Sequence, residues 1–468
     1  IKSCQLSLTD SGRCFSFPSE VCVLSRSFVL YRLPNVSCVV LVILAGFSLC
    51  FECRGWASFS NPRLILAQPD QGCSKLSEGR LDDSFAVMRE QVLELAGLDA
   101  PPKIFEDTNA NVVDGVRSIY FEALPWRGKQ TRVFALLGLP KKKPGEPDNV
   151  PVPGVVLVHG GGGTAFLPWV KKWNERGFAA ISIAVEGQTN QRDREGKKWV
   201  RHEWAGPERK GIYGDSELPL KEQWMYHSVA DTILAHSLLR SLPEVDSEKI
   251  GLVGISWGGV ITSTVIGIDH RFSFAVPTYG CGNLAESANQ YGIALGPNQV
   301  YRKVWDPMVR MDQVSIPVLW LTWPGDLHFP LDSVKNCYDK ALGPHMVSMI
   351  PGMKHSHGAG WNPPESYAFA DSIVSSGKPW CLQRGVLVDG LSGRLSFDAR
   401  RPVSKASLIC TADSGFTGTR KWQEIPAKFI QGKGRVVVNV ALPLGTTAWY
   451  VNVSSDGLTA SSDYQICN

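Results

Sequence analysis

Short, uninterrupted apolar runs separated by amphipathic stretches constrain the fold of this chain more than any other feature of its sequence. The runs occupy residues 153–160, 177–185, 249–255, 272–278, 316–323 and 345–351. An apolar run of this length without polar alternation is typical of a strand buried on both faces. Helical stretches lie between the runs, notably residues 220–242 and 331–342. The pattern therefore predicts an α/β fold with a doubly wound, mostly parallel sheet.

One serine stands where a predicted buried strand turns into a predicted helix. Residues 250–267 read IGLVGISWGGVITSTVIG, with Ser256 at the turn. In a parallel sheet, reactive groups collect at the carboxyl ends of the strands, where loops converge over a crevice. Glycines beside the serine leave room for a strained turn that exposes its hydroxyl. We therefore interpret Ser256 as a nucleophile; a glycine-rich packing turn is the plain alternative.

A serine nucleophile needs a base to take its proton and an acid to orient that base. Asp326 is the favoured acid, because it follows the predicted strand over 316–323 in a glycine turn. Asp306 and Asp332 are the rival acids near strand ends. Asp332 begins a predicted helix, and a capping role explains it more simply.

The base is expected from the loop after the last predicted strand, which reads MIPGMKHSHGAGW. His355 stands at the start of this loop and is the favoured base. His357 is the alternative base, and whichever histidine is not the base is expected to line the pocket.

The sequence HGGGGT at residues 159–164 follows the first buried run and supplies backbone N–H groups without side chains in the way. Such donors stabilise the oxyanion that forms when a serine attacks a carbonyl. Gly161 and Gly162 are the expected donors, together with the N–H of Trp257. The glycine run lacks the G-K-[ST] ending of a phosphate loop, so a nucleotide is not expected. No metal or other cofactor is needed for this chemistry.

These motifs, in the order Ser, acid, His, resemble the α/β-hydrolase superfamily. The resemblance covers about residues 110–376 and rests on HGGGGT, GISWGG, GDLHFP and PGMKHSHG. GISWGG is similar to the motif of dienelactone hydrolases, acetyl xylan esterases and prolyl-oligopeptidase-like proteins. The oligopeptidases carry a large β-propeller ahead of the hydrolase domain, and residues 1–110 are too few to build one. The resemblance therefore implies a serine esterase of the carboxylic ester hydrolase type rather than a peptidase.

A long, charged segment over residues 186–224 is expected to cover the mouth of the pocket. Its aromatic residues are candidates for stacking on a sugar ring, although anchoring of the loop explains them equally well; they are Trp199, Trp204, Tyr213 and Trp224. Cys281 follows the strand after the nucleophile helix and is a further candidate for the pocket; a small buried thiol is the plainer interpretation.

The first residues differ from the rest of the chain, and we expect residues 1–75 to be a leader or a poorly ordered segment. Residues 36–51 are apolar and uncharged, but the stretch is shorter than the roughly 20 residues that span a bilayer. A secretory signal fits better than an anchoring helix, so the protein is expected to be secreted or periplasmic, with no stable membrane span. The net charge of +4 is small for this length, which makes nucleic acid an unexpected partner.

Beyond the predicted catalytic domain over 80–378, the pattern changes to short β-type runs separated by turns. Residues 380–468 resemble an immunoglobulin or fibronectin type III-like β-sandwich, which either binds a glycan or packs on the catalytic body. The later cysteines show no C-x-x-C spacing and so no zinc site, but export would permit disulfides among them. They are Cys281, Cys337, Cys381, Cys410 and Cys467.

The sequence therefore favours a secreted serine esterase that acts on a small-molecule or polysaccharide ester, such as an acetylated xylan. A prolyl-oligopeptidase-like serine peptidase is the nearer alternative. A non-catalytic glycan-binding protein is the alternative from another class, and the complete set of Ser256, Asp326 and His355 argues against it. The oligomeric state is not readable from the sequence.

Overall fold

The structure is a computed structural model that describes residues 23–24, 28–31, 40–43, 71–107, 112–141 and 150–467, with side chains from residue 82 onward. Contacts divide the chain into two compact units, 1–77 and 78–468. In the first unit, an antiparallel sheet consists of β1 (Val23–Leu24), β2 (Phe28–Tyr31) and β3 (Val40–Ile43). β3 lies within the apolar stretch 36–51. Apart from these strands and the start of α1 (Gln71–Leu93), the rest of the leader predicted over 1–75 lies outside the described residues.

The second unit is built on a mixed sheet whose middle strands are parallel. Its strand order is β14-β13-β12-β11-β7-β8-β6-β5-β4, and every pair from β14 to β8 is parallel. The parallel strands are β7 (Val152–Val158), β8 (Ala179–Ile183), β11 (Val245–Ile255), β12 (Phe274–Thr278), β13 (Val318–Thr322) and β14 (His345–Met349). Each of them coincides with one of the predicted apolar runs. The antiparallel edge consists of β4 (Ile104–Glu106), β5 (Val116–Trp126) and β6 (Lys129–Gly138).

Helices cover this sheet because its middle strands are apolar on both faces. One pair, α2 (Leu167–Glu175) and α8 (Pro364–Ser376), is joined by the rings of Trp173 and Tyr367, whose centroids lie 4.7 Å apart. The helices α3 (Trp224–Arg240) and α4 (Trp257–Val265) pack on each other and on β11. The shorter helices are α5 (Gln290–Leu295), α6 (Leu331–Lys340) and α7 (His357–Trp361), and a small two-stranded sheet pairs β9 (Gln188–Arg192) with β10 (Trp199–Arg201).

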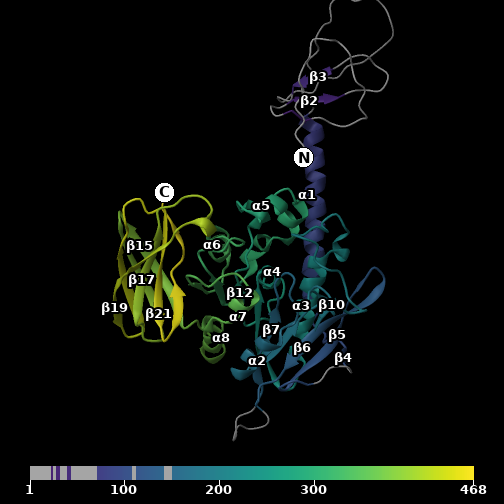
Figure 1. Cartoon of the computed structure of the whole chain (residues 1–468), viewed down its shortest axis with the longest axis horizontal. Coiled ribbons are helices and arrows are strands. Elements are labelled where there is room, and N and C mark those ends of the chain that lie inside the picture. The colour runs from purple at the N-terminus through teal and green to yellow at the C-terminus, as the bar shows by residue number, and fades with distance from the viewer. Residues whose placement is uncertain are drawn as a thin grey trace, which may run out of the picture. The chain divides into compact units, whose positions relative to one another are not determined.

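The C-terminal region is a sandwich of two antiparallel sheets (Figure 1, green to yellow). One sheet contains β15 (Cys381–Asp389), β16 (Ser392–Ala399), β20 (Arg435–Ala441) and β19 (Lys428–Gly432). The other contains β18 (Gln423–Pro426), β17 (Lys405–Thr411), β21 (Ala448–Ser455), β22 (Leu458–Ser461) and β23 (Gln465–Ile466). The α/β fold with a small all-β addition, expected from the sequence, is thus confirmed.

The second sheet of the sandwich continues the mixed sheet. Val347 of β14 pairs with Ser461 of β22 in antiparallel fashion, which joins the strands into one 14-stranded sheet. Residues 78–468 accordingly form one compact unit. The predicted boundary near residue 380 falls where the chain enters β15, and it stays a prediction.

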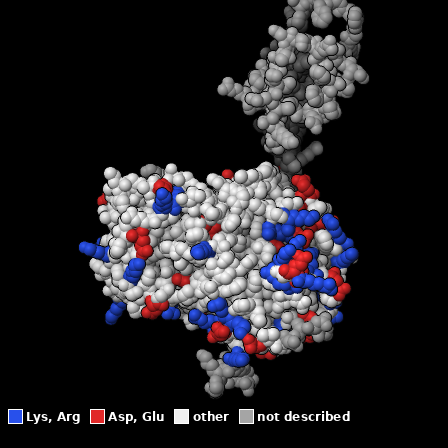
Figure 2. Space-filling view, viewed as in Figure 1, with Lys and Arg blue, Asp and Glu red and all other residues white. Residues whose placement is uncertain are grey.

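Surface charges of both signs lie side by side. Figure 2 shows Lys and Arg interspersed with Asp and Glu on the visible face, most densely where Figure 1 draws β5 and β10. Within the described part of the chain, none of the helices combines the length and the apolar character that crossing a bilayer requires.

Candidate active site

Ser256 occupies a strained turn between β11 and α4. Its φ of 58° and ψ of −119° lie in a region that non-glycine residues rarely adopt. The turn is tight enough to require glycines around it: a Cβ on Gly258 would lie 2.1 Å from the carbonyl oxygen of Val158, and one on Gly254 would lie 2.1 Å from that of Gly258. The strain and the close packing together present the Ser256 hydroxyl at the carboxyl end of the sheet.

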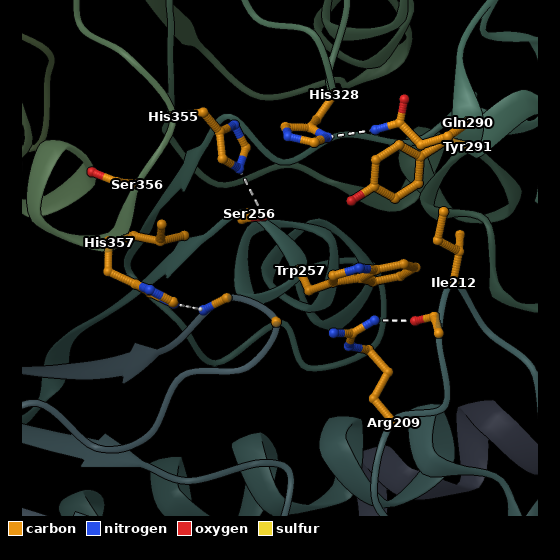
Figure 3. Close-up of a pocket in the computed structure, with 14 residues that line it drawn as sticks. Arg209, Ile212, Ser256, Trp257, Gln290, Tyr291, His328, His355, Ser356 and His357 are labelled. Atoms are coloured by element: carbon orange, nitrogen blue, oxygen red, sulfur yellow. Dashed lines mark hydrogen bonds between the residues drawn. The ribbon is translucent and has the colours of Figure 1, made fainter. Parts of the chain in front are cut away.

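The structure brings Ser256, His355 and Asp326 together from three strand ends. The Nε2 atom of His355 lies 3.0 Å from Ser256 Oγ, and its Nδ1 atom lies 2.8 Å from Asp326 Oδ2. Figure 3 shows the imidazole of His355 aimed at the serine. These are hydrogen-bond distances at both ring nitrogens, the arrangement in which a histidine takes a proton from one side while a carboxylate orients it from the other.

Asp326 is buried, with 1% of its surface exposed, and both of its carboxylate oxygens accept hydrogen bonds. Its Oδ1 accepts the N–H groups of His328 at 2.8 Å and Phe329 at 2.9 Å. Its Oδ2 also accepts the indole N–H of Trp323 at 3.2 Å. These three N–H groups hold the carboxylate in place beside His355.

The rival acids have partners elsewhere. Asp306 accepts the N–H groups of Asn283 and Met308, each at 2.9 Å, and burial raises the pKa of its carboxyl to about 6. Asp332 lies in the first turn of α6, where burial raises the pKa of its carboxyl.

His357 lies beside the glycine loop. Its Nε2 accepts the N–H of Gly160 at 3.0 Å, and its ring packs on Phe166 with a centroid separation of 4.9 Å. Burial lowers the pKa of His357 to about 4, so the ring is a neutral acceptor near pH 7. The structure therefore places His355 on the serine and His357 on the pocket wall.

Some of the backbone N–H groups near Ser256 already donate a hydrogen bond within the protein, and others do not. In the glycine loop, the N–H of Gly162 bonds Glu186 Oε1 at 3.3 Å, and the N–H of Gly163 bonds the carbonyl of Gly160 at 3.0 Å. Within the described residues, the N–H groups of Gly161 and Trp257 have no such acceptor. Of the three predicted donors, Gly161 and Trp257 are therefore free to bind an oxyanion, and Gly162 is engaged with Glu186.

These groups face a cavity of about 530 Å³, lined by Ser256, His355, Gly161 and Trp257 together with Arg209 and Tyr291. Figure 3 shows the guanidinium of Arg209 beneath the indole of Trp257, and its carbon lies 5.5 Å from that ring. Arg209 also pairs with Glu186, with 3.0 Å between Nε and Oε1. Sequence reasoning missed Arg209, because a charged residue in a long loop carries no periodic signal. It also missed Tyr291, which lies in the short helix α5.

The other predicted pocket residues lie elsewhere. Trp224 is buried and donates its indole N–H to the carbonyl of Val185 at 2.7 Å. Tyr213 is buried and hydrogen-bonds Gln223. Trp204 packs on the ring of Tyr120, with centroids 5.3 Å apart.

The described cysteines are buried or half-buried thiols. Cys281 is fully buried, and burial raises the pKa of its thiol. The five cysteines whose side chains the structure describes, Cys281, Cys337, Cys381, Cys410 and Cys467, are free, so no disulfide links them. Across the described part of the chain, no three or more His, Cys, Asp or Glu side chains form a cluster that could hold a metal ion.

A family model described as acetyl xylan esterase matches residues 82–283. That range includes the glycine loop and Ser256, on a sheet with the strand order found above. The chain has the α/β-hydrolase fold, as its motifs and strand order indicate. The family match, which covers less than half of the chain, supports a carboxylic ester hydrolase, as the motifs around Ser256 predicted.

Several solved structures of other hydrolases are similar to this chain at low sequence identity. An acetyl xylan esterase from Paenibacillus sp. R4 is 19% identical, with a TM-score of 0.47, over 58% of this chain and 89% of that chain. Acetyl xylan esterase 1 from Thermoanaerobacterium sp. JW/SL YS485 is also 19% identical, with a TM-score of 0.45, over 58% of this chain and 89% of that chain. A puromycin-hydrolyzing peptidase from Mycobacterium tuberculosis is 19% identical, with a TM-score of 0.41, over 57% of this chain and 40% of that chain. At such scores nothing follows about the activity of this chain. A search of curated proteins found no match.

Proposed function

We propose that this hydrolase removes acetyl or similarly small acyl groups from carbohydrate esters, with Ser256, His355 and Asp326 as its catalytic triad. The observation that carries the proposal is the unbroken hydrogen-bonded chain from Ser256 Oγ through His355 to Asp326. The two unengaged N–H groups of Gly161 and Trp257 in the same cavity support it. The acetyl xylan esterase family match supports an ester as the substrate.

The reaction begins when His355 Nε2 takes the proton of Ser256 and the serine oxygen attacks the carbonyl carbon of the ester. The carbonyl oxygen becomes an oxyanion, which accepts the N–H groups of Gly161 and Trp257. When the tetrahedral intermediate collapses, the bond to the alcohol oxygen breaks, and His355 gives its proton to that oxygen. The products of this step are the free alcohol and an acyl group on Ser256.

Water completes the cycle in a second step of the same kind. His355 takes a proton from the water, whose oxygen attacks the acyl carbon, and the same two N–H groups stabilise the new oxyanion. Collapse breaks the bond to Ser256, and His355 returns its proton to the serine. In both steps the imidazolium is stabilised by Asp326, whose place is fixed by the N–H groups of His328 and Phe329.

The test compares purified wild-type protein with Ser256→Ala on p-nitrophenyl acetate and on acetylated xylan. We expect kcat to fall by roughly 10⁴-fold or more in Ser256→Ala. Ser263→Ala is the matched control, since Ser263 lies in the same helix and donates to the carbonyl of Gly259. Its kcat should stay within about threefold of the wild type.

Other outcomes would redirect the proposal. If the wild type cleaves a proline-containing peptide and leaves acetylated xylan intact, the protein is a peptidase of the oligopeptidase type. If folded wild type hydrolyses neither ester nor peptide but binds a glycan, it is a non-catalytic binding protein. If Ser256→Ala retains wild-type hydrolysis, Ser256 is not the nucleophile.

We also propose that the protein is exported, with residues 36–51 serving as the apolar part of a secretory signal. Expression in a bacterial host, followed by fractionation and N-terminal sequencing, tests this. Export predicts a mature chain in the periplasm or medium that begins after residue 51, whereas an uncleaved chain in the cytoplasm would contradict it.

A further inference from the structure

The loop that carries Asp326 is covered by a turn from the C-terminal sandwich. This turn, Thr417–Thr419, is a single helical turn between β17 and β18. A Cβ on Gly418 would lie 2.2 Å from the carbonyl oxygen of Asp326 and 2.9 Å from its carbonyl carbon. Both distances are shorter than side-chain Cβ atoms tolerate, and the atoms they would meet are backbone. Glycine at position 418 therefore allows the sandwich to touch the main chain of the acid itself.

The neighbouring threonine holds the far end of the same loop. Thr417 is fully buried, and its Oγ1 accepts the N–H of Leu331 at 3.0 Å. Leu331 is the first residue of α6, where the backbone N–H groups lack partners within the helix. The sandwich thus contacts the acid loop at two points, the main chain of Asp326 and the N–H of Leu331.

The sandwich also holds the strand that leads to the base. Met349 ends β14, six positions before His355 in the sequence. Its N–H bonds Ser461 Oγ at 2.8 Å, and its carbonyl accepts the side-chain amide of Asn452 at 3.1 Å. Both partners belong to the sheet that continues the hydrolase sheet.

We propose that the C-terminal sandwich is a working part of the active site, in which Thr417 and Gly418 are positioning residues for Asp326. The inference rests on the proposed triad. The bond between Asp326 and His355 is 2.8 Å long, and displacement of a catalytic group by about 1 Å is enough to cost on the order of a hundredfold in rate. Thr417 and Gly418 affect the reaction only by fixing the position of the Asp326 carboxylate.

The experiment uses the full-length protein and four variants. Thr417→Val keeps the shape of the side chain and removes the acceptor for Leu331, whereas Thr417→Ser keeps the hydroxyl. Gly418→Ala pushes a methyl group against Asp326. Gly432→Ala is the matched control, because Gly432 is in the same sandwich and has no atom within 4 Å of an added Cβ.

Three measurements are made on each variant: steady-state kinetics on p-nitrophenyl acetate for kcat and KM, the melting temperature, and the far-downfield ¹H NMR signal of the His355 Nδ1 proton. We expect Thr417→Val and Gly418→Ala to lower kcat about 10- to 100-fold with KM within about twofold. The downfield signal should broaden or move upfield, because the hydrogen bond to Asp326 lengthens. Thr417→Ser and Gly432→Ala should resemble the wild type in all three.

The proposal is overturned if folded Thr417→Val and Gly418→Ala keep the wild-type kcat and the wild-type NMR signal. It is also overturned if their activity loss equals the fraction of protein that is unfolded, since the turn would then contribute stability alone. The NMR signal needs no substrate, so it reports on the positioning of Asp326 even if the proposed esterase activity is not found.

Discussion

The active site is divided between two regions that are built differently. The nucleophile half, residues 82–283, is the part that the family model matches and contains the glycine loop and Ser256. The acid half, residues 284–467, contains Asp326, His355 and the sandwich. In the nucleophile half, Ser256 is held by the hydrolase's own backbone, through contacts such as that of Gly258 with the carbonyl of Val158. In the acid half, Asp326 is held by the nearby N–H groups of His328 and Phe329, and its main chain is also contacted by Gly418 of the sandwich.

This difference shows which parts of the site can be recognised from a short stretch of sequence. A turn that requires glycines at fixed positions leaves a motif in the sequence, because each glycine is needed at its own place. The acid half leaves the motifs GDLHFP and PGMKHSHG, but the sandwich turn that contacts Asp326 has no recognisable motif. The family model matches the nucleophile half, and the contact between the sandwich and the acid loop is seen only in the packing.

The largest effect expected from the acid half is loss of the base. His355→Asn should lower kcat by roughly 10⁴-fold, because no other group would take the proton of Ser256. His357→Asn should lower it by only about tenfold, since His357 accepts the N–H of Gly160 and does not contact the serine. Steady-state kinetics on p-nitrophenyl acetate measures both. An equal or larger loss in His357→Asn would make His357 the base.

Within the nucleophile half, the packing of Gly258 should dominate stability. Gly258→Ala places a methyl group 2.1 Å from the carbonyl oxygen of Val158, so we expect the free energy of unfolding to fall by about 3 kcal/mol. Gly97→Ala is the control, because an added Cβ there meets nothing within 4 Å. Urea titrations followed by circular dichroism measure the difference. Equal stability of Gly258→Ala and the wild type would show that this turn is looser than described.

The nucleophile half should also respond to acid through His202. Burial lowers the pKa of His202 to about 4, and within the described residues neither ring nitrogen has a hydrogen-bond partner. The unfolded chain therefore binds a proton at this position near pH 6.5 that the folded chain does not, so stability is lost as pH falls from 6.5 towards 4.

At pH 5 this difference corresponds to about 2 kcal/mol. His202→Phe, which keeps a ring against Tyr120, should reduce the loss of stability between pH 8 and pH 5 by that amount. Urea unfolding of both proteins at the two pH values measures it. The same loss on acidification in both would exclude His202 as a source.

The smallest effect concerns a contact between the halves. Tyr279 donates its hydroxyl to the carbonyl of Ser356 at 2.6 Å, and its ring stacks on His355 with centroids 4.3 Å apart. Tyr279→Phe keeps the stacking and removes the hydrogen bond, so kcat should fall about three- to tenfold. Tyr120→Phe, remote from the cavity, is the control. No change in Tyr279→Phe would mean that stacking alone places the His355 loop.

The sequence predicts the skeleton of the site well, for physical reasons. Buried parallel strands are continuous apolar runs, so their ends could be located, and Ser256, Asp326 and His355 each lie just past such an end. The choice of His355 over His357 could not be made as firmly, because two histidines in one loop differ only in where the loop turns.

The walls of the cavity could not be predicted. Trp224 and Tyr213 are aromatic residues in and beside a long loop, and the sequence does not tell whether such residues face a ligand or the core; here they are buried. Arg209 lines the cavity because its charge is partnered by Glu186, a pairing between residues that no periodic pattern connects. The joining of β14 to β22 is likewise a matter of register between distant strands.

The central claim is that Ser256 is a nucleophile activated by His355. The most direct test treats the folded protein with a fluorophosphonate and locates the adduct by mass spectrometry. The account predicts one adduct, on Ser256, with labelling slowed at least a hundredfold in His355→Asn. An adduct on any other residue, or no labelling of folded wild-type protein, would contradict it.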